Sequence, residues 1–69
     1  MRVIDKLEIP SINWYDVQIG TNVYDVTVLS DGGIRIYHLN SYDEIKNEVL
    51  RQEIIIFIKD YMTMEKLSK

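Results

Sequence analysis

The chain has 69 residues, a formal net charge of −3 and no cysteine, which points to one small domain over residues 1–69 without a disulfide framework or a thiolate metal site. Its eight basic residues are scattered, so direct binding to DNA or RNA, which needs a basic patch, is disfavoured. The longest apolar run, residues 54–58, is far shorter than the about 20 residues of a membrane span, and no apolar signal segment follows Arg2, so a cytoplasmic location is expected.

The N-terminal segment, residues 1–10, allows two interpretations. Val3, Ile4 and Leu7 fit either one face of a short helix or an edge strand. Pro10 ends whichever element forms, because proline lacks an amide N–H and restricts the preceding residue.

Residues 12–39 are expected to form a three-stranded antiparallel meander, because apolar and polar side chains alternate along them. The clearest signal is a hairpin over residues 22–39, whose halves flank a Ser-Asp-Gly-Gly turn. Its apolar sets reach one face only if the loop has an odd number of residues, which predicts a three-residue loop at 30–32 or 31–33. The alternation assigns these residues to the core face: Tyr15, Val17, Ile19, Tyr24, Val26, Val28, Ile34 and Ile36.

The turn after the first of these strands leaves two registers open. A two-residue turn at 20–21 puts Asp16 directly opposite Asp25, an unfavourable pairing of like charges. A four-residue turn at 20–23 pairs Asp25 with Gln18 instead. The two registers predict different electrostatics for the same sheet face.

Residues 41–66 are predicted to form one long helix that covers the core face. Ser41 and Glu44 match a capping box, and the residues that follow favour helix without a glycine or proline. In the alternative, the helix ends near Arg51 and residues 54–58, which are β-branched and aromatic, form a fourth strand. No turn residue separates the two parts, so the long helix is favoured. The expected fold is therefore α+β, with a possible extra N-terminal strand or short helix.

The apolar arc of this helix is broader than contact with one sheet requires. One stripe is expected to pack on the sheet and a second on another copy of the chain. The sequence thus predicts a homodimer through four residues of the helix: Ile54, Ile58, Tyr61 and Met62.

The sheet face opposite the core is the candidate binding site. Aromatic side chains and an arginine among polar residues are typical of protein-binding hot spots. The expected partner-binding residues are Trp14, Asp16, Asp25, Thr27, Arg35 and Tyr37. An alternative for Trp14 is that residues 1–10 fold over it as a lid.

Other candidate chemistry is weak. His38 is the only histidine, and Ser41 lies three residues from it, but no third orienting group or oxyanion hole is recognisable. Asp31, Asp43 and Glu44 lack the spacing of a calcium-binding loop. We therefore predict no catalytic residue, no metal site and no cofactor, and a hydrolase centred on His38 is a remote third hypothesis.

The expected order of three strands and a helix resembles AP2-like DNA-binding domains and the core of double-stranded-RNA-binding domains. The basic residues with which those families reach phosphates are missing here, so no site is carried over. The size and the Ile-, Asn-, Lys- and Tyr-rich composition are typical of small phage or mobile-element proteins, several of which inhibit host defence nucleases with acidic side chains. The sequence therefore favours a small acidic, non-catalytic protein-interaction module that inhibits a host protein. The alternative is a nucleic-acid-binding regulator that uses the open sheet face through Trp14, Arg35 and Tyr37.

Overall fold

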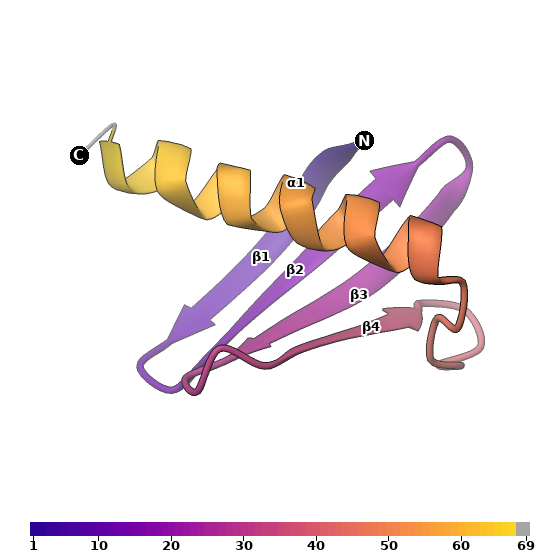
Figure 1. The fold of residues 1–69 in the computed structure, drawn as a ribbon, viewed down its shortest axis with the longest axis horizontal. Helices are drawn as coiled ribbons and strands as arrows, with labels where there is room; N and C mark the ends of the chain where they lie inside the picture. Colours follow the sequence, from indigo (N-terminus) through magenta and orange to yellow (C-terminus); the bar gives the residue numbers. More distant parts are fainter. Residues whose placement is uncertain (68–69) are drawn as a thin grey trace.

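The computed structural model describes residues 1–67, which form four strands followed by one helix (Figure 1). The elements are β1 (Arg2–Ile9), β2 (Ile12–Ile19), β3 (Asn22–Leu29), β4 (Ile34–His38) and α1 (Glu48–Leu67). The strands form one antiparallel meander in the order β1-β2-β3-β4, and α1 crosses one face of it (Figure 1). The α+β fold is confirmed. The N-terminal segment is an edge strand, so the sheet departs from the three-strand order that resembles AP2-like domains.

The β3–β4 hairpin has the predicted three-residue loop. The N–H of Leu29 donates to the carbonyl of Gly33 at 2.8 Å, and the N–H of Gly32 donates to the carbonyl of Leu29 at 3.0 Å, which leaves residues 30–32 as the loop. Gly32 has a φ of 91°, which costs a glycine little because it has no Cβ. Val26 consequently pairs with Ile36, and the apolar sets of both strands share one face.

The core lies between this face and the helix. Its buried side chains come from β2, β3, β4, the loop before α1, and α1 itself: Tyr15, Val17, Tyr24, Val26, Ile36, Ile45, Ile54 and Ile58. The remaining predicted core residues, Ile19, Val28 and Ile34, are partly buried against it. The alternation in the sequence therefore identified the core face of the sheet correctly.

The helix begins later than predicted, at Glu48. The capping box is wrong, because the side chain of Asn47 accepts hydrogen bonds from the N–H groups of Val49 and Leu50 at 3.1 and 3.2 Å. Asparagine caps a helix as well as serine does. Residues 43–45 instead run beside β4, where the N–H of Ile45 donates to the carbonyl of Ile36 at 2.9 Å.

Three contacts hold α1 across the sheet. Arg51 donates to the backbone carbonyl of Ile34 on β4 at 3.2 Å. The ring of Tyr61 meets that of Tyr15 on β2 edge to face, with centroids 5.7 Å apart. Near the end of the helix, Glu65 forms an ion pair with Lys6 on β1.

The alternative of a strand over residues 54–58 is wrong. These residues belong to α1, and Ile54 and Ile58 are both fully buried. Residues four apart share a face in a helix, so this pattern of burial fits helical packing on the sheet.

Candidate functional site

The candidate site is the sheet face that α1 leaves uncovered, called the open face below. The register sets its side chains in rows that run across the strands. All the partner-binding residues predicted from the sequence lie on it: Trp14, Asp16, Asp25, Thr27, Arg35 and Tyr37. Strand β1 adds Asp5 and Leu7, which pair with Asp16 and Trp14 and which the sequence did not identify as site residues.

The turn between β2 and β3 decides how the charges are arranged. It has two residues, Gly20 and Thr21, and Gly20 has a φ of 61°, as expected for the first residue of a type II′ turn. Asp16 therefore lies directly opposite Asp25. The four-residue alternative, which pairs Asp25 with Gln18, is wrong.

A β-bulge in β1 brings a third aspartate to the open face. The register shifts between Val3 and Asp5, so that Asp5 pairs with Asp16. Without the extra residue, Ile4 would face Asp16 and Asp5 would turn toward the helix. The bulge thus completes a row of like charges on three adjacent strands, Asp5, Asp16 and Asp25, which we call the aspartate row.

The aspartate row is electrostatically unfavourable. Burial raises the pKa of Asp16, and the charge of Asp5 raises it further. Burial and then the charge of Asp16 raise the pKa of Asp25 in the same way. Among residues 1–67 the row forms no ion pair, because both ion pairs found there join Lys6 to a glutamate. Like charges opposed across strands cost stability, so a proton or an added cation would relieve the row.

A second row runs beside the aspartate row. It consists of Leu7, Trp14, Thr27 and Arg35. Because β1 lies in the plane of the sheet, the alternative in which residues 1–10 cover Trp14 as a lid is wrong, and Leu7 beside Trp14 is 57% exposed. A shallow hollow lined by Asp5, Lys6, Leu7, Trp14 and Asp16 joins the two rows.

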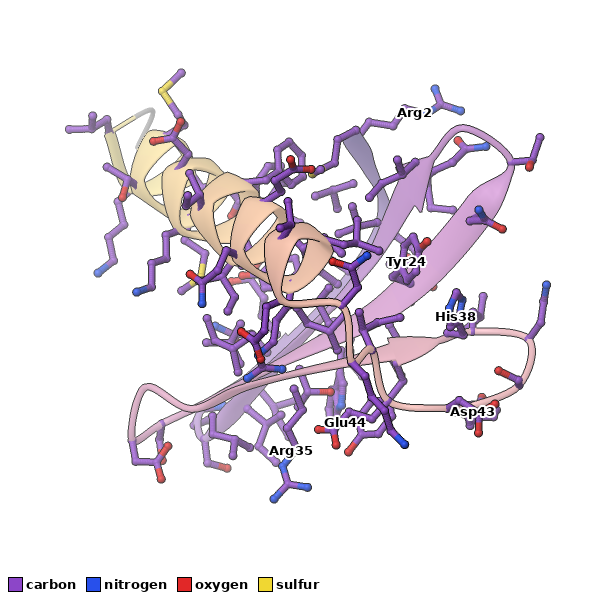
Figure 2. The ribbon with its side chains drawn as sticks, turned by 45° about the vertical axis from the view of Figure 1, so that its right-hand side comes forward. Arg2, Tyr24, Arg35, His38, Asp43 and Glu44 are labelled. Atoms are coloured by element: carbon purple, nitrogen blue, oxygen red, sulfur yellow. The ribbon has the colours of Figure 1, made fainter. Side chains whose placement is uncertain are left out.

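Arg35 borders the site at its β4 end. Its guanidinium donates to the hydroxyl of Tyr37 at 3.4 Å, and this bond, with the nearby charge of Glu44, raises the pKa of Arg35. Figure 2 shows Arg35 and Glu44 extending from the side of the sheet opposite α1. Tyr37 is in register with Asp25, so the aspartate row ends at an aromatic side chain.

The predicted dimer residues lie on the covered side of α1. Ile54 and Ile58 are 0% exposed, and Tyr61 and Met62 pack against the same core. A fully buried side chain cannot reach another folded copy, so placing Ile54 and Ile58 in a dimer interface is wrong. The apolar residues that α1 does expose are Val49, Ile56, Met64 and Leu67.

His38 and Ser41 have separate structural contacts. The rings of Tyr24 and His38 project toward the α1 side of the sheet (Figure 2), with centroids 4.9 Å apart. The hydroxyl of Ser41 accepts a hydrogen bond from the N–H of Asp43 at 3.4 Å. Neither contact provides the serine–histidine hydrogen bond that a nucleophile needs.

In residues 1–67, no three histidine, aspartate or glutamate side chains are grouped so that they could hold a metal ion. The aspartates of the row stand side by side on neighbouring strands, about 4.8 Å apart in the hydrogen-bonding direction.

No family model, no curated protein and no solved structure matches this chain. Within residues 1–67, α1 is too polar to cross a lipid bilayer. Function is therefore inferred from the chemistry of the open face.

Proposed function

We propose that this chain is a non-catalytic interaction protein whose open face binds a basic surface of another protein. The aspartate row carries the proposal. Three carboxylates stand opposite one another on adjacent strands, and no cationic side chain of residues 1–67 pairs with them. This repulsion destabilises the fold, and a cationic partner would remove the repulsion.

The chemistry of such a partner follows from the row. Guanidinium and ammonium groups form charge-assisted hydrogen bonds with carboxylates, and these bonds are about twice as strong as neutral ones. Each bond would also lower the repulsion between neighbouring aspartates. Complementary charge speeds association and disfavours wrong partners, so a basic protein surface should be selected over a neutral one.

Aromatic side chains strengthen this interpretation. Trp14 lies in the row next to the aspartates, and Tyr37 lies at the end of the aspartate row. Both are partly exposed, and a cation above an aromatic ring gains about 0.5–2 kcal/mol. Tryptophan, tyrosine and arginine are the residue types that most often dominate binding energy at interfaces.

A groove that binds nucleic acid is the basic surface that such a face fits best. Its lysine and arginine side chains are placed to meet a series of phosphates, and the aspartate row offers a series of carboxylates. We propose that the chain occupies such a groove and inhibits its owner, as expected of a small phage or mobile-element protein acting on a host defence nuclease. The cytoplasm is the proposed location.

The nucleic-acid-binding alternative has less support. Arg35 is the one basic residue in the two rows of the open face that residues 1–67 form. Phosphates that approached it would also meet the aspartate row, whose charge repels them.

The test uses Trp14, the single tryptophan, as a fluorescent reporter on the open face. A cationic peptide such as hexa-arginine should change its emission, and the affinity should fall steeply with added salt. The double substitution Asp16→Asn and Asp25→Asn should weaken binding by about tenfold, since each lost charged hydrogen bond is worth about 1.5–3 kcal/mol before solvent screening reduces it.

A matched control changes two carboxylates on α1, Glu53→Gln and Asp60→Asn, which are exposed away from the site. It alters the net charge equally and should leave the affinity nearly unchanged. Equal losses in both double variants would show non-specific attraction and contradict the proposal. Binding of duplex DNA at low salt by the unmodified chain would favour the nucleic-acid alternative instead.

A further inference from the structure

The two edges of the sheet are protected differently. Along β4, the loop before α1 pairs with the outer edge: the N–H of His38 donates to the carbonyl of Asp43 at 2.9 Å, and the N–H of Ile45 donates to that of Ile36 at 2.9 Å. Strand β1 pairs with β2 on one side, and no other strand of residues 1–67 lies on its outer side. An open edge presents unpaired N–H and C=O groups to another strand.

Backbone geometry identifies which groups of β1 face outward. The N–H of Lys6 donates to the side chain of Asp5 at 2.9 Å, so it points away from β2. In an antiparallel ladder, alternate residues direct their N–H and C=O groups to the same side. Lys6 and Glu8 therefore present their backbone groups to the free edge, whereas those of Leu7 face β2.

The part of this edge that can pair regularly is short. The bulge between Val3 and Asp5 interrupts it at one end, and Pro10, which has no N–H, interrupts it at the other. Residues 5–9 remain, and their midpoint is Leu7.

We propose that a second copy of this chain pairs with β1 in antiparallel fashion about a two-fold axis at Leu7. This pairing places Lys6 opposite Glu8 of the second copy, and Glu8 opposite Lys6 of the second copy, so opposite charges meet twice. The two Leu7 side chains, each 57% exposed in the single chain, meet at the axis beside Trp14 of each copy. The four-stranded sheet is doubled into one continuous sheet, with both helices on the same side.

Other registers about a two-fold axis are less favourable. An axis at Asp5 brings two carboxylates together, an axis at Lys6 two ammonium groups, and an axis at Glu8 two carboxylates again. Like charges directly opposite across strands are destabilising. Among positions 5–8, only the axis at Leu7 avoids them. An axis at Ile9 would place Glu8 opposite Pro10, which has no N–H to donate, so charge and backbone together favour the register at Leu7.

This edge dimer does not rest on the proposed binding of a basic protein, because the backbone groups of β1 form it, and within the aspartate row it affects only Asp5. Pairing would replace the bond between the Lys6 N–H and Asp5 with a backbone hydrogen bond. The Asp5 carboxylate would then be released toward the open face.

Sedimentation equilibrium of the intact chain between about 5 and 300 µM tests the inference, a range in which a small interface should assemble. We expect a dimer at the upper end. Leu7→Asp, which places two carboxylates at the axis, should raise the dissociation constant by about tenfold or more. The matched control is Ile56→Asp on the outer side of α1, where Ile56 is 64% exposed; it should leave the dimer intact.

A charge reversal tests the register itself. Glu8→Lys should weaken the dimer, because it places lysines opposite one another. A triple variant adds Lys6→Glu and Glu65→Lys to Glu8→Lys. It reverses the sign of all three charges in the Lys6–Glu8 and Lys6–Glu65 ion pairs, so opposite charges again face each other between the copies and the dimer should be restored. Hydrogen exchange of the Glu8 amide should slow with rising protein concentration in the unmodified chain.

A monomer at every concentration would overturn the inference. The inference would also be overturned if Ile56→Asp dissociated the dimer and Leu7→Asp did not, because that result would assign the interface to α1. Thermal unfolding of each variant shows that the loss of the dimer is not a loss of folding, and Glu8→Gln provides a milder second variant that should weaken the dimer by less than Glu8→Lys.

Discussion

The two faces of the sheet affect the stability of the fold in opposite directions. On the covered face, apolar residues such as Val17 and Ile36 are fully buried beneath α1, and their burial stabilises the fold. On the open face, Asp16 and Asp25 are held opposite each other, which destabilises it. Substitutions on the two faces should therefore change stability in opposite directions.

The largest effect is expected on the covered face. Ile54→Ala should lower the free energy of unfolding by about 3 kcal/mol, because it leaves a cavity between α1 and the sheet. A chain of this size has only a few kcal/mol of stability, so much of the protein should unfold at room temperature. Urea denaturation followed by circular dichroism measures this loss. Ile56→Ala, on the exposed side of the same helix, should change the value by less than about 0.5 kcal/mol.

A smaller loss is expected where α1 begins. Asn47→Ala removes the acceptor for the N–H groups of Val49 and Leu50 and should cost about 1 kcal/mol. Ser41→Ala should cost much less, since Ser41 lies before the helix and makes one long hydrogen bond of 3.4 Å. Comparing the two variants by urea denaturation checks the helix start. A greater loss in Ser41→Ala would instead support the capping box.

The smallest expected change in stability is a gain, and it comes from a substitution on the open face. Asp25→Asn should raise the free energy of unfolding at pH 7 by about 0.5 kcal/mol, because it removes one charge from an opposed pair. Asp60→Asn on α1 is the control and should give no such gain. A loss of stability in Asp25→Asn would mean that the aspartate row is not repulsive.

The stability gained by Asp25→Asn should depend on pH in a defined direction. The pKa of Asp25 is raised in the folded chain, so the folded state takes up a proton at a higher pH than the unfolded state. Burial of the ionised carboxylate, together with repulsion from Asp16, therefore lowers stability fully above the raised pKa. This loss is relieved as the pH falls toward about 3.9, the usual pKa of aspartate. The advantage of Asp25→Asn should accordingly shrink between neutral pH and pH 4 in parallel denaturation curves.

The sequence predicted the core of the sheet because alternation depends only on local pattern. Val26 and Ile36 were assigned correctly to one face, and the loop at 30–32 followed from the need to align them. The start of α1 was missed because Ser41 and Asn47 are both good capping residues. Residues 43–45 pair with β4 instead of joining the helix. The helix therefore begins after them, with Asn47 as its cap.

The site was predicted only in part. Trp14, Asp25 and Arg35 were placed on the open face by alternation, but the position of Asp5 depends on a bulge, and the local pattern of β1 does not indicate where a bulge falls. The apolar stripe of α1 that faces the sheet was also misassigned. Ile54 and Ile56 are equally apolar in sequence, and only packing shows that the first is buried and the second exposed.

The most direct test of the open face is a titration of the side-chain carboxyl of Asp25 by NMR, with and without a saturating cationic peptide such as hexa-arginine. In the free chain its pKa should lie above about 3.9, because of burial and the charge of Asp16. Cations bound along the row should lower it, since an opposite charge favours the ionised form. A pKa that the peptide leaves unchanged would contradict the claim that this face binds a basic partner.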